Sequence, residues 1–576
     1  MKNKEIAEML GEIALMLSVD TRPTARFEVR AYQKAALTIG TLQEDVGEIF
    51  AKGGERALME LPGIGKGIAG SVAEYIKTGK MKKYDGLKRQ YPIDFKALTA
   101  IEGLGAKRLI RLYNELGIKD VDDLSRAVKA HKIEKLEGFG RRSEEQIGKG
   151  IELAEKGRGR ILISEGLPVA EAIVKRIMES GAAEMAVVAG SARRMRETVG
   201  DLDILVLSSK PGKAMDFFAG LDEVSSIVMK GPTKTTAWLK AGVTCDVRVI
   251  APESFGAALQ YFTGSRDHNV QVRTIAVRKG YKLNEYGLFR EGGRPVEAGS
   301  EEEIYAKLGM QWMPPEMREA RGEVGLAQAK RIPKIVELED IKGDMHTHTR
   351  ETDGANTIEE MAEEAMKIGY RYFATTNHTK SLFIARGMDE KKFTGFFKNV
   401  DRLNEQLDGK VRIIKGAEVD ILKDGSLDLD KKFLEEMECA VGAVHQSLRM
   451  DRESMTKRIV GALDSGLIRI LAHPTGRELL WREPYAVDLD RVFDAAERNN
   501  VALEINSYPS RLDLSDTNIM AASKYKLMFS LGTDAHRTSH MRFMRYGVGT
   551  ARRGWLAPDR IINTMDMARM LRWLSR

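Results

Sequence analysis

The sequence predicts a multidomain protein with a helical first part, a mixed α/β middle part and a C-terminal α/β barrel. Its 576 residues exceed what a single hydrophobic core usually holds, so several domains are expected. A glycine-centred repeat precedes residue 150, and β-branched runs alternate with helical patterns between residues 159 and 250. After residue 343, short strands alternate with amphipathic helices, which is typical of a barrel that carries its polar residues at strand ends.

The composition excludes several classes of protein. Hydrophobic residues make up 43% of the chain and charged residues 30%, which favours a globular protein over a disordered or collagen-like one. No apolar run approaches the ~20 residues that a membrane span needs, so we expect a cytoplasmic protein without a membrane partner. The two cysteines, Cys245 and Cys439, are too few for a disulfide framework or for cysteine-based zinc fingers. The net charge of +7 is a mild excess, so any surface for a polyanion must come from local placement of charge.

The repeat in the first part predicts a backbone site for phosphates. Its copies are LPGIGKGIAGSVAEYI, IEGLGAKRLIRLYNEL and LEGFGRRSEEQIGKGI, each an apolar-x-Gly-apolar-Gly pattern before an amphipathic helix. Two glycines around an apolar residue allow a tight turn whose N–H groups point outward at a helix N-terminus. The copies resemble the helix-hairpin-helix motif, which holds DNA backbone phosphates without reading sequence. The predicted DNA-binding residues are the repeat glycines and the lysines beside them: Gly63, Gly65, Lys66, Gly103, Gly105, Lys107, Gly138 and Gly140.

The stretch GSARRMRETVGDLDILV predicts a triphosphate and metal site in the middle part. A strand places Asp201 and Asp203 on one face, because side chains two residues apart point the same way. A later strand, TCDVRVI, supplies Asp246 between apolar residues. Adjacent carboxylates repel unless cations lie between them, and two divalent ions that bridge a hydroxyl and a triphosphate need this arrangement.

The first half of the same stretch carries groups that suit phosphate. Gly190 lets the backbone approach a ligand, Ser191 offers a hydroxyl and an N–H, and Arg194 offers a planar fork of donors. Together with CDVRVI and ALQYFTGSRDHNVQVRTIAVRKGYKLNEYGLF, this stretch resembles a family X DNA polymerase over residues 1 to about 320. The resemblance implies a palm over 159–250 and a thumb over 251–318.

The resemblance also implies roles for individual residues. Asp201, Asp203 and Asp246 would hold two catalytic ions, Mg²⁺ or Mn²⁺, with Asp246 nearest the primer 3′-hydroxyl. Ser191 and Arg194 would hold the β- and γ-phosphates of a deoxynucleoside triphosphate. Tyr261, Phe262 and Gly264 would line the sugar side of the nucleotide. Asn269 would contact its base, and Arg273 would contact the template side.

The sequence departs from the mammalian-type family pattern after the first hairpin. Members that remove a 5′-deoxyribose phosphate use a lysine that forms a Schiff base. Here Ser71 stands at that position, and Gly67 stands where a supporting lysine is common. Lys34 matches a residue that binds the 5′-phosphate, so gap recognition is expected without lyase chemistry.

Histidines predict a second metal site after residue 343. Six of the nine histidines lie at strand ends there, paired with carboxylates, and packing alone does not require imidazole at successive strand ends. This part, over 341–576, resembles the PHP (polymerase and histidinol phosphatase) domain. The resemblance implies three divalent ions, Mn²⁺ or Zn²⁺, and nine ligands: His346, His348, Asp353, His378, Glu418, His445, His473, Asp534 and His536. Asn377 stands where an aspartate usually precedes the histidine, and we expect it to support a ligand from behind.

The resemblances divide the chain into six segments and indicate two enzymatic activities. The expected segments are helical domains over 1–85 and 86–158, the palm, the thumb, a linker over 319–340, and the PHP domain. We expect a monomeric DNA repair enzyme that fills short gaps in gapped or nicked duplex DNA and trims 3′ ends with a 3′ to 5′ exonuclease. The PHP domain also suggests 3′-phosphatase or abasic-site endonuclease activity. Two alternatives stay open: a DNA end-bridging scaffold with structural metals, and a non-templated nucleotidyltransferase, which Asn269 and Arg273 disfavour.

Overall fold

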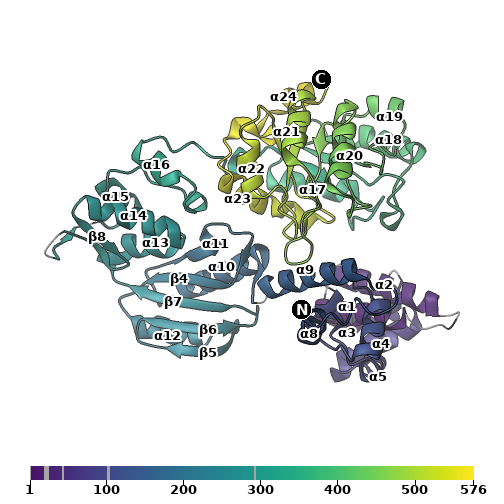
Figure 1. The fold of residues 1–576 in the computed structure, drawn as a ribbon, viewed down its shortest axis with the longest axis horizontal. Helices are drawn as coiled ribbons and strands as arrows, with labels where there is room; N and C mark the ends of the chain where they lie inside the picture. Colours follow the sequence, from purple (N-terminus) through teal and green to yellow (C-terminus); the bar gives the residue numbers. More distant parts are fainter. Residues whose placement is uncertain are drawn as a thin grey trace. The chain divides into compact units, whose positions relative to one another are not determined.

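The computed structural model of the chain divides into two compact units (Figure 1). One unit comprises residues 1–158 with 480–482, and the other comprises residues 159–479 with 483–576. The described residues are 2–18, 22, 25–41, 45–61, 63–99, 101, 104–157, 159–290, 293–296 and 298–575. Among them, no helix combines the length and the apolar character that crossing a membrane requires.

The first unit is helical throughout its described residues, as the sequence predicts. Its helices are, in chain order, α1 (Lys2–Leu17), α2 (Ala25–Thr41), α3 (Val46–Met59), α4 (Lys66–Thr78), α5 (Lys82–Gln90), α6 (Phe95–Thr99), α7 (Ala106–Leu116), α8 (Val121–Lys129) and α9 (Arg141–Gly157). One hydrophobic core extends from Ile6 in α1 to Ile151 in α9. Residues four apart, such as Ile68 and Val72 in α4, are buried together because they lie on one helix face.

The repeat glycines form the turns that the sequence predicts. Gly63 and Gly138 have φ angles of +83° and +77°, a region that residues with a side chain rarely adopt. The second glycine of a copy directly precedes its helix, as Gly65 precedes α4 and Gly105 precedes α7. Gly103, the first glycine of the second copy, lies outside the described residues.

The second unit begins with a five-stranded sheet in the order β2-β4-β7-β6-β5. Its elements are α10 (Ile163–Glu179), β2 (Met185–Val188), α11 (Gly190–Arg193), β4 (Asp201–Leu207), α12 (Pro211–Ala219), β5 (Val224–Lys230), β6 (Lys234–Leu239) and β7 (Thr244–Ile250), with the short pair β1 (Ile161–Leu162) and β3 (Thr198–Val199). β4 and β7 are parallel neighbours at the centre, and helices α10 and α12 share the core of this sheet. The sequence does not predict β5, because this edge strand is exposed along almost its whole length and shows no apolar alternation.

The thumb follows the sheet directly. It consists of α13 (Phe255–Thr263), α14 (Arg266–Arg278), the strands β8 (Tyr281–Asn284), β9 (Gly287–Arg290) and β10 (Pro295–Val296), and α15 (Glu301–Lys307). The segment expected to be a linker is folded. Its helix α16 (Glu323–Gln328) buries Val324 in the thumb core, and Val336 packs in the core of the last domain.

The last domain is a barrel of seven parallel strands in sequential order, as expected. The strands are β11 (Gly343–Thr347), β12 (Tyr372–Thr375), β13 (Arg412–Asp420), β14 (Cys439–Ala443), β15 (Ile470–Leu471), β16 (Ala502–Asn506) and β17 (Phe529–Gly532). A parallel bridge between Thr347 and Ala535 brings the last strand back to the first, so the barrel is nearly closed. The helices of this domain are α17 (Ile358–Ile368), α18 (Glu390–Leu407), α19 (Lys431–Glu435), α20 (Arg452–Asp464), α21 (Leu489–Arg498), α22 (Asp516–Ala522), α23 (Met544–Arg553) and α24 (Met567–Leu574) (Figure 1). The strand ends that carry histidine therefore converge at one mouth of the barrel.

Candidate active sites

The five-stranded sheet, which is the predicted palm, brings the three predicted aspartates together. In the parallel register of β4 and β7, Asp203 pairs with Asp246, while Asp201 precedes Asp203 by two residues on the same strand face. Two cationic side chains contact Asp246: Lys234 Nζ lies 2.9 Å and Arg248 NH2 lies 2.8 Å from its Oδ2. The structure therefore forms a carboxylate triad from strands more than 40 residues apart in sequence.

The electrostatics of this triad fit divalent cations. Burial, and then the charges of Asp201 and Asp246, raise the pKa of Asp203 to about 7. Burial alone would raise the pKa of Asp246 as well, but hydrogen bonds from Thr236 and Lys234 and the charge of Arg248 lower it. Three carboxylates this close carry repulsion that a proton or a cation must relieve. A pair of divalent ions between the three carboxylates would relieve this repulsion.

Gly190 lies against the triad. Its φ is +63°, and a Cβ at this position would lie 2.3 Å from Asp203 Oδ2. The sequence predicts that this glycine lets the backbone approach a ligand, and in the structure its missing side chain makes room for Asp203. Ser191, the next residue of α11, is half-buried.

Arg194, the predicted phosphate ligand, is held by two protein groups. Its Nε donates to Glu319 Oε1 at 2.9 Å and its NH1 donates to the carbonyl of Thr263 at 2.8 Å. Its neighbour Arg193 donates to Thr263 Oγ1 at 2.6 Å and forms two hydrogen bonds with Glu301, at 2.9 and 2.8 Å. Both arginines thus fasten the start of the palm site to the end of α13.

The predicted nucleotide pocket lies on α13 and α14. The rings of Tyr261 and Phe262 meet edge to face at 5.1 Å between centroids, and the Arg248 guanidinium lies 4.7 Å from the Phe262 centroid. Because Arg248 also contacts Asp246, it joins the aromatic pair to the triad.

Asn269 and its neighbours stabilise the turn between these two helices. The Asn269 amide donates to the carbonyl of Tyr261 at 2.6 Å, and its Oδ1 accepts from Gln260 at 3.0 Å. A Cβ at Gly264 would lie 2.5 Å from Asn269 Oδ1, so the turn requires a glycine there. Exposed Arg273 donates to the Asn269 carbonyl at 3.3 Å. Base contact by Asn269 and template contact by Arg273 stay predictions.

The helical unit places Lys34 over the first hairpin. A Cβ at Gly63 would lie 2.6 Å from the Cγ and Cδ atoms of Lys34, so the lysine stem covers the glycine. Lys66 and Lys107 are exposed at the N-termini of α4 and α7. Ser71 is an ordinary residue of α4 whose hydroxyl donates to the carbonyl of Gly67 at 3.1 Å.

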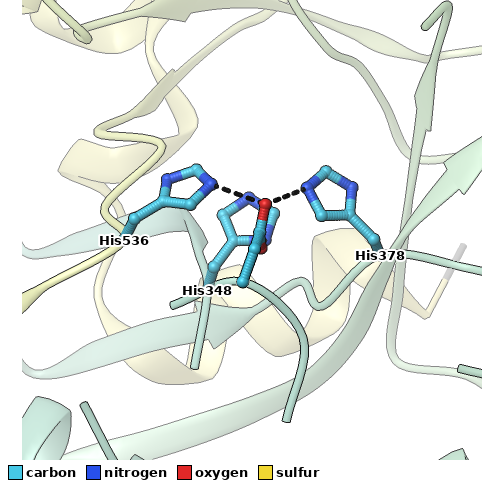
Figure 2. A group of neighbouring side chains, drawn as sticks. His348, His378 and His536 are labelled. Carbon is cyan, nitrogen blue, oxygen red and sulfur yellow. Dashed lines mark hydrogen bonds and ion pairs between the residues drawn. The ribbon is translucent and has the colours of Figure 1, made fainter. Parts of the chain in front are cut away.

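The barrel brings the predicted histidine cluster together. Figure 2 shows His348, His378 and His536 around a carboxylate, which belongs to Asp353. The Nε2 atoms of His378 and His536 each lie 3.3 Å from Asp353 Oδ2. Donor atoms of these four residues lie within 4.8 Å of one another, close enough to share one ion.

Two further ligand groups overlap with the first. His346, His348 and Asp534 form one, in which His348 Nε2 lies 3.1 Å from Asp534 Oδ1. The other contains His378, Glu418 and His445, and Glu418 stands at its centre. Glu418 carboxylate oxygens lie 2.9 Å from His378 Nδ1 and 3.1 Å from His445 Nε2.

His473 completes the predicted set. Its Nε2 lies 2.9 Å from Glu418 Oε1. His473 and Asp534 adopt positive φ angles of +27° and +53°. Such strained backbone is concentrated at functional sites. All nine predicted ligands therefore face one region of the barrel mouth.

This cluster fits divalent metal ions. Several buried atoms lack a hydrogen bond of proper geometry within the described part of the chain, although some of them lie close to an opposite charge: His346 Nε2, both ring nitrogens of His348, His378 Nδ1, Glu418 Oε2 and His473 Nδ1. Burial lowers the pKa of His378, but Glu418 and Asp353 raise it to about 10. Without a cation the site would have to retain protons among buried carboxylates, whereas metal ions satisfy the same lone pairs.

Two acidic residues that the sequence does not predict contact the predicted ligands from behind. Glu504 on β16 lies 2.7 Å from His346 Nδ1 and also accepts from the His473 backbone N–H at 2.7 Å. Asp420, two residues after Glu418, lies 2.6 Å from His445 Nδ1. A carboxylate behind a ligating imidazole fixes its tautomer and ring orientation. The signal in the sequence that could have predicted these two residues is an acidic residue within an otherwise apolar strand.

Asn377 acts on the loop before the predicted ligand Asp353 and not on the histidine beside it in sequence. Its Oδ1 accepts from the Thr349 backbone and from the Thr352 hydroxyl, at 2.9 and 3.0 Å, and its amide donates to the Thr349 hydroxyl. The residue therefore holds the loop that leads to Asp353, and it contacts no ligand histidine in the described structure. A neutral amide suits this position because its partners are hydroxyl and amide groups.

Comparison with known proteins identifies the chain. Residues 1–81 match a helix-hairpin-helix domain, 95–151 a SAM-like helix-hairpin-helix tandem, 258–319 a DNA polymerase beta thumb and 344–508 a PHP domain. The DNA polymerase/3′-5′ exonuclease PolX of Bacillus subtilis (strain 168) is 34% identical over 579 residues, covering 100% of both chains. The chain belongs to the PolX family of DNA polymerase/3′-5′ exonucleases. Its dependence on divalent metal ions follows from the polymerase and PHP domains.

Three further proteins are each similar to part of the chain. A protein named probable phosphatase from Tolumonas auensis is 30% identical over 204 residues, 34% of this chain and 77% of its own. Another from Syntrophotalea carbinolica is 27% identical over 230 residues, 38% of this chain and 90% of its own. A crystal structure of Leishmania infantum polymerase beta in a ternary complex is 26% identical, with a TM-score of 0.26, and covers 39% of this chain and 97% of that one.

Proposed function

We propose that this PolX enzyme fills short gaps in duplex DNA at the palm and removes unextendable 3′ nucleotides at the barrel mouth. The parallel register that places Asp203 opposite Asp246, beside Asp201, carries the polymerase assignment. A carboxylate triad in this arrangement suits two divalent ions, whereas a scaffold would have no use for it.

At the palm, the proposed reaction joins a primer 3′-hydroxyl to the α-phosphate of a deoxynucleoside triphosphate and releases pyrophosphate. Asp201, Asp203 and Asp246 would hold two Mg²⁺ or Mn²⁺ ions, which lower the pKa of the attacking hydroxyl and neutralise the charge that develops on the phosphates. Asp246 would lie nearest the primer. Arg248, which contacts both Asp246 and Phe262, would keep that carboxylate in place.

Binding of the nucleotide would use groups on both sides of the triad. Ser191 and Arg194 would contact the β- and γ-phosphates, because a hydroxyl and a guanidinium fork complement phosphate oxygens. On the thumb, Tyr261, Phe262 and Gly264 would line the sugar. Asn269 and Arg273 would contact the incoming base and the template, which favours template-directed over non-templated addition.

At the barrel mouth, the proposed reaction is hydrolysis of a terminal phosphodiester. The nine ligands would hold three ions, Mn²⁺ or Zn²⁺, which activate water and stabilise the departing oxygen. Glu504 and Asp420 would keep His346 and His445 in the tautomers that bind metal. The relatives named probable phosphatases match this part of the chain, which supports 3′-phosphatase activity as a second activity of the same site.

DNA would be held by the hairpin turns of the helical unit. The exposed Lys66 and Lys107 stand beside outward-facing helix N-termini, which suits contact with phosphates on a DNA backbone. Lys34, packed over Gly63, would contact a 5′-phosphate at the far side of a gap. We propose that the enzyme works as a monomer, because one chain carries both sites and the DNA-binding turns.

Primer extension tests this proposal. Gapped, nicked and open-template substrates would be compared with Mg²⁺ and with Mn²⁺, and 3′ digestion would be followed on the same gels. We expect extension to be fastest on short gaps that carry a 5′-phosphate. Equal rates with and without the 5′-phosphate would contradict gap filling, and the absence of both reactions would favour an end-bridging scaffold.

A further inference from the structure

A buried ion-pair network connects the predicted phosphate ligand of the palm to helix α23 of the PHP domain. Glu319 stands at its centre. Its Oε1 accepts from Arg194 Nε at 2.9 Å and from Arg553 NH1 at 3.0 Å. The side chains of Arg194, Glu319 and Arg553 are only 11%, 9% and 2% exposed. Buried charges of this kind depend on each other, because removing one leaves its partners unpaired in a low dielectric.

Arg553 also fixes the backbone of the palm segment. Its NH1 donates to the carbonyl of Arg194 at 2.9 Å, and its NH2 lies 2.6 Å from Asp516 Oδ2. The next palm residue, Met195, has a φ of +52°, and a Cβ at Gly549 of α23 would lie 2.7 Å from its side chain. Helix α23 therefore contacts both the main chain and the side chains of this turn at close range.

The orientation of Arg194 leaves one edge of its guanidinium for a ligand. Glu319 occupies Nε and the Thr263 carbonyl occupies NH1. Within the described residues, the third nitrogen, NH2, makes no hydrogen bond. A guanidinium held at two nitrogens by protein groups presents the remaining donors in a fixed direction, which lowers the cost of binding an oxyanion.

We propose that Arg553 and Glu319 are positioning residues for nucleotide incorporation: the PHP domain, through α23, holds Arg194 in the direction in which it binds the triphosphate. This inference rests on the proposed role of Arg194. It makes the nuclease domain part of the polymerase's nucleotide site, separately from its own metal cluster. Without Arg553, Glu319 would keep only Arg194 and the more distant Arg196, whose NH1 lies 3.6 Å from its Oε2, as cationic partners among the described residues. The carbonyl of Arg194 would also lose its hydrogen bond from Arg553.

The matched control lies next to Arg553 on the same helix. Arg552 donates from Nε to Glu316 Oε1 at 2.8 Å and from NH1 to the Val336 carbonyl at 2.9 Å. Its side chain is 12% exposed, so it too is a largely buried arginine in contact with the end of the thumb. It does not contact Arg194 or Glu319 in the described structure. A general effect of disturbing α23 would appear on substitution of either arginine, whereas a positioning effect would appear only on substitution of Arg553.

The test uses the full chain with Arg553→Met, Glu319→Gln, Arg552→Met and Arg194→Met. Single-turnover filling of a one-nucleotide gap gives the dissociation constant of the triphosphate, and inhibition by inorganic pyrophosphate gives a second readout of the same phosphate contacts. We expect Arg553→Met and Glu319→Gln each to weaken the binding of the triphosphate and of pyrophosphate by about tenfold, which corresponds to one charge-assisted hydrogen bond. Affinity for gapped DNA, 3′ digestion and the Arg552→Met variant should stay within about twofold of the wild type.

The outcomes separate this inference from the proposed function. In the Arg194→Met background, Arg553→Met should add nothing further, because the interaction it supports is already lost. If Arg194→Met weakens the triphosphate but Arg553→Met and Glu319→Gln do not, the positioning role is wrong and the role of Arg194 stands. If Arg194→Met has no effect, the phosphate role itself is wrong. Should Arg553→Met fail to fold, Glu319→Gln, which keeps the shape of the side chain, decides the question.

Discussion

The carboxylate of Asp203 occupies the space where Gly190 would carry a side chain. A Cβ built on Gly190 lies 2.3 Å from Asp203 Oδ2, closer than any real contact. The positive φ of the glycine adds backbone strain to the same substitution. The turn predicted to bind phosphate and the strand predicted to bind metal are therefore fitted to each other at this one position.

Gly190→Ala should accordingly impair polymerisation by displacing Asp203. A shift of about 1 Å at a catalytic carboxylate can reduce turnover on the order of 10²-fold. Gap filling under single-turnover conditions would measure this, with Gly212→Ala as the control, since a Cβ at Gly212 of α12 meets nothing within 4 Å. Wild-type rates in Gly190→Ala would show that the contact has no catalytic consequence.

Glu504→Gln should weaken the barrel metal site without unfolding the barrel. The amide keeps the size of the side chain but loses the charge that faces His346 Nδ1. Loss of such a partner typically costs about 10–100-fold in metal affinity. Metal content after dialysis and the Mn²⁺ dependence of 3′ digestion would report it. Glu435→Gln serves as the control, because Glu435 is exposed and pairs with Lys431 on the same helix. An unchanged metal affinity in Glu504→Gln would contradict the orienting role of Glu504.

The enzyme should form no borohydride-trapped adduct with a 5′-deoxyribose phosphate end. A Schiff base needs an amine, and both Ser71 and Gly67 lack one. The Ser71 hydroxyl is instead engaged with the helix backbone. Trapping on an incised abasic substrate would check this, with gap filling on the same preparation as proof of active protein. A strong adduct would mean that another lysine, such as Lys66, performs the chemistry.

The sequence predicts those parts of the two sites whose signals are local. Asp201 and Asp203 alternate with apolar residues in one strand, and His346 and His348 are two residues apart at the end of another, so the shared direction of each pair follows from strand geometry alone. The exposed edge strand β5 has no such alternation and was missed.

Supporting contacts between distant residues could not be predicted in this way. Glu504 and His346 are 158 residues apart, and Glu319 and Arg553 are 234 apart. An acidic residue in an apolar strand shows that a partner exists, but only the folded barrel shows which one. Asn377 illustrates the same limit, because its partners are two threonines of a loop and not the histidine beside it in sequence.

The palm assignment predicts the outcome of removing two aspartates. Asp201→Ala with Asp203→Ala should abolish extension, because two of the three carboxylates of the triad are lost. Digestion of 3′ ends should persist, since the histidine cluster has its own ligands. Primer extension and 3′ digestion measured on one preparation would show this, and synthesis near the wild-type rate would refute the assignment.

The central claim is that two separate metal sites perform the two reactions. The most direct test compares the double aspartate variant with a variant of the histidine cluster on the same gapped DNA. His346→Ala with His348→Ala removes two buried ligands of the barrel cluster. We expect it to reduce 3′ digestion by orders of magnitude, about 10³-fold or more, while gap filling continues. Retention of digestion in this variant would contradict the histidine cluster as the nuclease site. Loss of both reactions together, in either variant, would contradict the separation of the two sites.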